Sequence, residues 1–228
     1  MKLLSTFILT TLVKLTAAQF AIVSDKDGYC NVRSAAATGN NIAGKLQNEH
    51  LVYCFETKGN WTYINYAQKG KEYNGYVYTD RLTQVSGYTT IPVSSKAENS
   101  ISFQKEAVKI TLTQQKFNKQ QYKFSYYKDA PTQIEYINGK QYWGTDGGLP
   151  TTAYQSVVIQ IGTKTMRLPA AALSNLFEPS LYSTTVNYDQ KNDILYIQSM
   201  NSDGAGAYDV IWRIENGVYK DRYVAYGF

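Results

Sequence analysis

The side chains that most often carry acid–base or nucleophilic chemistry are scarce in this chain of 228 residues. The single histidine is His50, and both cysteines, Cys30 and Cys54, lie in the first quarter of the chain. A cysteine hydrolase needs a thiolate beside a histidine base, so the rest of the chain cannot form one. A zinc hydrolase normally draws on two or three histidines. We therefore predict no catalytic residue, no metal site and no cofactor, and we interpret His50 as an exposed loop residue.

Carboxylate chemistry remains open. A glycosidase uses two acids about 5–10 Å apart, and most acids after position 107 stand beside glycine, asparagine or lysine at expected turns, where acids usually cap the turn. A carboxylate-dependent glycosidase is therefore kept only as a third function hypothesis. The candidate acids are Glu135, Asp146, Glu178, Asp189, Asp193, Asp203, Asp209, Glu215 and Asp221.

Two glycine-rich segments combine aromatic and acidic side chains. Residues 142–150 read YWGTDGGLP, and residues 201–208 read NSDGAGAY. Glycine permits positive φ and a close approach of the backbone, but neither segment matches a phosphate-binding or calcium-binding loop. One interpretation is a pair of tight turns. The other is a paired loop surface that binds a partner through aromatic anchors and acidic acceptors. Its candidate residues are Trp143, Asp146, Asp203 and Tyr208.

The elements that would position these residues are mainly strands, because 21 tyrosines accompany many threonines, valines and isoleucines. The Asn138-Gly139 pair predicts a tight hairpin. One short helix is expected at 169–177, opened by Pro169 and ended by Pro179. The sequence thus predicts an antiparallel β-sheet or barrel domain at 107–228. The expected strands are 108–113, 121–127, 133–137, 141–143, 153–161, 164–168, 183–188, 194–200, 208–214 and 218–225.

Four different short motifs follow one another before position 86. They are GYCNVR (28–33), IAGKL (42–46), GNWTYI (59–64) and NGYVYTDRL (74–82). In this order and spacing, the set resembles a bacterial SH3 domain, a small barrel often attached to exported cell-wall proteins. Alternating strands at intervals of about ten residues also describe a small closed barrel.

The resemblance implies that this first unit is a targeting module for a cell-wall peptide or another envelope ligand. The residues to test in its groove are Trp61, Tyr63 and Tyr76. Trp61 has an alternative interpretation as a core residue, because a small barrel commonly buries one large aromatic. The chain departs from the family pattern by an insertion at 68–72, which bears on the groove.

The domain boundaries follow from these patterns. We expect a small SH3-like barrel at 19–86 and a linker at 87–106, which is rich in serine, threonine and glycine and lacks sustained periodicity. Residues 1–18 have the positive start, apolar run and small final residues of a signal peptide. A buried N-terminal strand or helix is the alternative there. The protein is therefore expected to be exported, periplasmic or secreted, without a transmembrane segment.

In an oxidising compartment, an even number of cysteines predicts a disulfide between Cys30 and Cys54. It would close a loop of about 24 residues and stabilise the fold by roughly 3 kcal/mol. Two small buried thiols are the alternative.

Charge argues against nucleic acid as a partner. The whole chain is formally +5, and loss of Lys2 and Lys14 with the signal peptide leaves 21 basic and 18 acidic residues, or +3. The basic and aromatic stretch at 116–128 is interpreted as a solvated hairpin. The leading hypothesis is thus a non-enzymatic envelope protein that binds a cell-wall peptide or a protein partner. The second hypothesis is an inhibitor or immunity protein against a toxin or cell-wall hydrolase.

Overall fold

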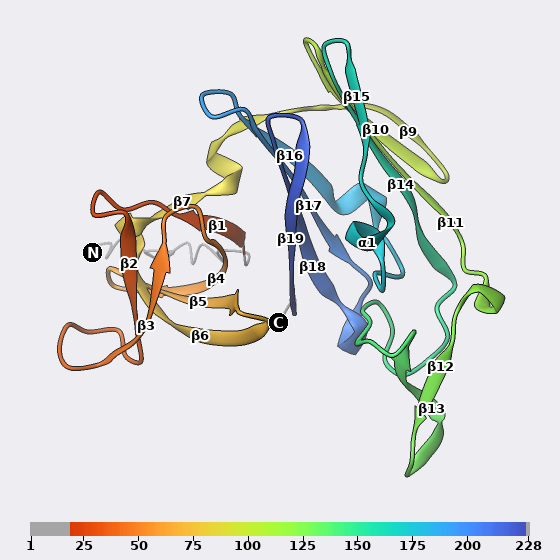
Figure 1. Cartoon of the computed structure of the whole chain (residues 1–228), viewed down its shortest axis with the longest axis horizontal. Coiled ribbons are helices and arrows are strands. Elements are labelled where there is room, and N and C mark those ends of the chain that lie inside the picture. The colour runs from red at the N-terminus through yellow and green to blue at the C-terminus, as the bar shows by residue number, and fades with distance from the viewer. Residues whose placement is uncertain (1–18, 227–228) are drawn as a thin grey trace, which may run out of the picture.

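The computed structural model describes residues 19–226, which form a mainly β protein with several antiparallel sheets and one short helix (Figure 1). The expected fold class is confirmed at this level. The proposed signal peptide, 1–18, lies outside the described residues. No helix of the described part is long and apolar enough to cross a membrane.

The first seven strands form one antiparallel sheet that curls into a half-barrel (Figure 1). We call it the N-terminal sheet, and its strand order is β3-β2-β6-β5-β4-β1-β7. One face buries small and branched apolar side chains, among them Val32, Leu46 and Ile64. The strands are β1 (Gln19–Val23), β2 (Tyr29–Arg33), β3 (Ile42–Gln47), β4 (Leu51–Lys58), β5 (Trp61–Gln68), β6 (Lys71–Tyr78) and β7 (Leu82–Gln84).

The predicted disulfide is wrong, because Cys30 and Cys54 are both free and buried. Cys30 lies on β2 and Cys54 on β4, and the strands β6 and β5 separate these two strands in the sheet. Burial raises the pKa of Cys30 to about 11 and that of Cys54 to about 12. Both thiols therefore stay protonated and pack as small apolar groups in the core of the N-terminal sheet.

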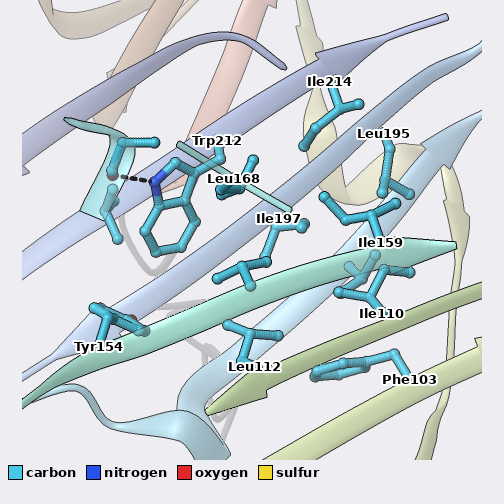
Figure 2. Packing of buried hydrophobic residues seen from close by; sticks show 14 of the residues in the cluster. Phe103, Ile110, Leu112, Tyr154, Ile159, Leu168, Leu195, Ile197, Trp212 and Ile214 are labelled. Carbon is cyan, nitrogen blue, oxygen red and sulfur yellow. Dashed lines mark hydrogen bonds between the residues drawn. The ribbon is translucent and has the colours of Figure 1, made fainter. Parts of the chain in front are cut away.

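Two five-stranded antiparallel sheets follow and pack face to face; we call them the sandwich. Their strand orders are β15-β14-β11-β10-β9 and β19-β18-β17-β16-β8. Figure 2 shows the core between them, where Phe103 and Leu112 face Ile197 and Trp212. The strands are β8 (Thr89–Thr90), β9 (Val93–Ala97), β10 (Ser100–Lys105), β11 (Val108–Lys116), β14 (Thr152–Ile161), β15 (Lys164–Arg167), β16 (Thr184–Asp189), β17 (Ile194–Asn201), β18 (Tyr208–Glu215) and β19 (Val218–Tyr226).

The segment expected to be a linker, 87–106, instead contains β8, β9 and β10. Ile101 and Phe103 of β10 are 1% and 2% exposed and belong to the sandwich core. They alternate with Ser102 and Gln104, so the strand has the expected period of two. Serine and other polar residues on the neighbouring positions made this strand resemble a loop in the sequence.

The predicted helix is shorter than expected, because α1 covers only Ala170–Leu173. The helix ends at Ser174, whose backbone is extended (φ −65°, ψ 141°), and Asn175 then adopts φ +60°. Its side-chain amide donates to the carbonyls of Ile137 and Gln141, so the chain beyond α1 is held against another loop. The expected strand at 141–143 is absent, and Trp143 makes only an isolated bridge to Leu176.

A two-stranded hairpin, β12 (Phe124–Tyr127) and β13 (Ala130–Ile137), projects from the sandwich (Figure 1). Its base is anchored by a small apolar cluster that includes Ile134, Ile137 and Phe177. The base of the hairpin is therefore fixed, while its end extends into solvent.

The N-terminal sheet packs against the outer face of the sheet that contains β17 and β18. A second apolar core joins Phe20 and Tyr53 of the N-terminal sheet to Tyr196, Ile211 and Tyr223 of the sandwich. Consequently β18 and the first half of β17 are buried on both faces, and every residue from Tyr208 to Ile214 is buried. The two parts are held together by this shared core rather than joined by a loose tether.

Asp209 lies in this interface and accepts a hydrogen bond from the Tyr53 hydroxyl. Burial raises the pKa of the Asp209 carboxyl, although the hydrogen bond opposes that shift. A carboxyl with a raised folded-state pKa contributes its stability below the unfolded pKa and loses it as pH rises. We therefore expect Asp209→Asn to be more stable than the parent at pH 7 and equally stable near pH ~3. Urea unfolding at both values, with exposed Asp203→Asn as the control, measures this. A less stable Asp209→Asn protein at pH 7 would contradict it.

Candidate functional site

The three aromatic residues proposed from the sequence for the first unit lie on one face of the β5–β6 hairpin. Trp61 pairs with Tyr78, and Tyr63 pairs with Tyr76. The ring centroids are 5.0 Å apart in the first pair and 5.1 Å apart in the second. All four side chains are half-buried. The alternative interpretation placed Trp61 in the core. The core side of β5 is instead its opposite face, which includes Ile64.

A groove of about 290 Å³ lies beside Trp61. Charged residues of both signs line it, and the Arg81 guanidinium is 3.2 Å from the Asp25 carboxylate. The Arg33 guanidinium lies 5.8 Å from the centre of the Trp61 ring. Tyr63 and Tyr76 do not line this groove. The charged, polar and aromatic side chains that line the groove are Asp25, Asp27, Tyr29, Asn31, Arg33, Thr38, Trp61, Tyr78 and Arg81.

Hydrogen bonds hold the walls of the groove in place. Arg33 donates to the Gly39 carbonyl at 3.0 Å and to Asn41 Oδ1 at 2.7 Å. The Tyr78 hydroxyl accepts from Asn60 at 2.9 Å. These contacts fix the guanidinium and the phenol ring without a ligand.

The insertion at 68–72 does not cover the groove. Lys69 and Gly70, with φ +53° and +75°, form a two-residue turn that joins β5 to β6. This turn is at one end of the hairpin, and the Trp61–Tyr78 pair is at the other. Residues 71–74 belong to β6, and the inserted residues lengthen the hairpin away from Trp61.

Sequence reasoning missed Tyr78, Arg33 and Arg81 as groove residues. Tyr78 was within reach, because residues on two strands joined by a tight turn pair at equal distances from that turn. The tight turn within the insertion at 68–72 was not recognised in the sequence, so this register was missed. Arg81 has no comparable signal, since it follows the hairpin in a single 3₁₀ turn.

The two glycine-rich segments of the sandwich meet in space, as the paired-loop hypothesis requires. The Ser202 hydroxyl donates to the Gly144 carbonyl at 2.7 Å. A Cβ built at Gly206 would lie 2.9 Å from Thr145 Cα, so only glycine permits this approach. The loops are therefore packed backbone to backbone.

The four residues proposed on these loops have different roles. Asp146 and Asp203 are exposed, and Trp143 is half-buried. Tyr208 is 0% exposed, and its hydroxyl donates to the Phe177 carbonyl at 2.9 Å. The proposal that Tyr208 contacts a partner is wrong, because the ring belongs to the core. Its centroid lies 6.1 Å from that of Trp143, which it supports from beneath.

A hollow of about 700 Å³ lies between the loops, and Asp146, Glu178 and Asp203 line it. Glu178 accepts hydrogen bonds from the backbone and hydroxyl groups of Thr151 and Thr152. Its carboxylate therefore ties two chain segments together. Within residues 19–226, no group of three or more histidine, cysteine or acidic side chains is placed to hold a metal ion.

His50 is half-buried rather than exposed, and its Nε2 lies 3.0 Å from the Ala67 carbonyl. Burial lowers its pKa, so the ring is held neutral. It lines neither the groove beside Trp61 nor the hollow between the loops.

Comparison with protein-family models, curated proteins and solved structures finds no match for this chain.

Proposed function

We propose that this chain is an exported, non-enzymatic binding protein of the bacterial envelope, periplasmic or secreted, and that its N-terminal sheet is a bacterial SH3-like module that docks to a cell-wall peptide or a protein partner. The groove beside Trp61 carries the proposal. It joins aromatic rings to carboxylates and guanidinium groups within one small hollow. This set of groups suits a short peptide that presents both an amine and a carboxylate.

Each part of such a peptide finds a complementary group. Asp27 attracts an ammonium group, because Asp25 is already paired with Arg81. Arg33 uses Nη1 for Gly39 and Asn41, and its remaining N–H groups can donate to a carboxylate. The Trp61 and Tyr78 rings offer apolar area for the aliphatic part of the ligand. Because hydrogen bonds already hold Arg33 and Tyr78, little conformational freedom is lost on binding.

The test is retention of the chain from residue 19 onward on purified peptidoglycan. Trp61→Ala is expected to weaken retention at least tenfold, since a central aromatic anchor contributes about 2 kcal/mol or more. Tyr63→Ala is the matched control, because Tyr63 lies on the same face but outside the groove. Trp61 is half-exposed, so we expect the variant to stay folded, which thermal unfolding verifies. Equal retention of the Trp61→Ala protein and the parent would refute the proposal.

The glycine-packed loop pair favours a second candidate, an inhibitor or immunity protein that binds a toxin or cell-wall hydrolase. Leu149 is 50% exposed beside exposed Asp146, which gives a rigid surface with one apolar contact. Capture of one hydrolase from an envelope extract by the parent, but not by Leu149→Asp, would favour this candidate. The three carboxylates of the hollow between the loops do not favour a glycosidase site there. Glu178 is occupied by Thr151 and Thr152, and Asp146 and Asp203 are exposed, whereas a glycosidase acid lies in an apolar pocket.

A further inference from the structure

A third hollow lies on the other side of the 142–150 loop, and four aromatic rings line it. It encloses about 320 Å³. Two acids and two amides complete its set of long side chains, and no lysine or arginine lines it. The residues that matter for its chemistry are Tyr127, Gln133, Glu135, Gln141, Tyr142, Trp143, Asp146 and Tyr226.

Contacts within the protein fix the orientation of these rings. Trp143 and Tyr226 have centroids 4.4 Å apart and planes inclined at 57°, so they form a corner. Gln141 Nε2 donates to the Tyr226 hydroxyl at 2.8 Å. The Tyr142 hydroxyl donates to the Ile134 carbonyl at 3.1 Å. The hollow is thus built before any ligand arrives.

The charged side chains that line the hollow are acidic, whereas the chain as a whole carries a net positive charge. The chain has 23 basic and 18 acidic residues, and Lys128 and Lys140 lie near the hollow in the sequence. The lining nevertheless has Glu135 and Asp146 without a basic residue. An anionic ligand would meet two carboxylates and four aromatic side chains with no basic group, which is unfavourable.

The same groups stabilise a positive charge. A cation over an aromatic face is attracted by the ring quadrupole, and alkylated ammonium groups are the ligands that several rings together recognise best. We propose that this hollow binds an organic cation, namely a quaternary or alkylated ammonium group. Trp143 and Tyr226 supply the ring corner, and Asp146 and Glu135 supply the counter-charge.

The volume and the donor atoms narrow the ligand class. About 320 Å³ is at the small end of ligand sites, which suits a compact headgroup. A hard metal ion needs several oxygen ligands, and the described residues provide no such cluster. The site is separate from the groove beside Trp61, so the inference does not depend on the proposed function.

The test compares choline with its neutral isostere, 3,3-dimethyl-1-butanol, by titration calorimetry on the chain from residue 19 onward. Choline is expected to bind at least about tenfold more tightly than the isostere, because only choline gains from the rings and the carboxylates. Equal binding of the two, or no binding of choline at 20 mM or below, would overturn the proposal.

Variants locate the binding. Trp143→Leu and Tyr226→Leu each replace an aromatic ring with a smaller aliphatic side chain, and each is expected to weaken choline binding about tenfold. Tyr226 is 51% exposed at the end of β19, so this variant tests the ring without endangering the fold. Asp146→Asn is expected to weaken choline severalfold. Asp203→Asn is the matched control, since Asp203 lines only the neighbouring hollow. Equal weakening by both Asp variants would show a general field effect and refute the site.

Discussion

Trp212→Ala is expected to lower the free energy of unfolding by about 3–5 kcal/mol. The Trp212 side chain is 0% exposed and fills the space between the two sheets of the sandwich (Figure 2). Its ring lies edge-on to Tyr154 with centroids 5.4 Å apart. Its Nε1 donates to the Ala172 carbonyl at 2.8 Å, so the indole also holds α1 against the core. Truncation leaves a cavity and removes this tie.

Urea unfolding followed by circular dichroism measures the loss. Trp212→Phe is the matched comparison, because it keeps an aromatic ring and removes the indole N–H together with part of the ring system; we expect it to cost about 1–3 kcal/mol. Arg222 Nη1 also donates to the Ala172 carbonyl, so that acceptor stays satisfied in both variants. A loss below about 1 kcal/mol for Trp212→Ala would mean that the sheets collapse onto the vacated space.

The apolar periodicity of the sequence was sufficient to predict most of the strands of the sandwich. Strands such as β14 and β18 have clear apolar runs between turn residues, and both were predicted within a few positions. It failed for β10, whose Ile101 and Phe103 are surrounded by serine and polar residues. It also could not show that β18 and the first half of β17 are buried on both faces, because that depends on the N-terminal sheet packing against them.

The disulfide prediction failed for a related reason. An even number of cysteines indicates pairing only when the fold brings the two Cα atoms close together. Strand order decides this, and β6 and β5 separate the strands of Cys30 and Cys54. No local pattern in the sequence contains that order.

The candidate sites were predictable only where they lie on one local element. Trp61, Tyr63 and Tyr76 belong to one hairpin, and their shared face follows from strand alternation. The ring corner of the third hollow joins Trp143 to Tyr226, far apart in the sequence. Nothing near either residue signals the other, so only the fold could reveal this site.

Arg213→Met is expected to lower the free energy of unfolding by about 3 kcal/mol, the lower end of the range for a broken buried ion pair. Arg213 is 7% exposed and pairs with Asp221 and Glu215. Its Nη1 also donates to the Glu49 carbonyl of the N-terminal sheet at 2.8 Å. The substitution leaves two carboxylates without this counter-charge; Asp221 is partly exposed, which limits the cost. Exposed Arg167→Met is the matched control.

Two probes within the same protein show whether Arg213 fixes the N-terminal sheet to the sandwich. Thiol labelling of Cys30 and Cys54 reports the opening of the N-terminal core, because both thiols are buried there. Circular dichroism reports all the sheets together. Since the apolar core at the interface joins the two parts, we expect both signals to change at the same urea concentration in the parent and to shift together in Arg213→Met. Labelling well before the loss of sheet structure would instead show that the N-terminal sheet opens independently. The arrangement of the groove beside Trp61 relative to the third hollow would then not be fixed.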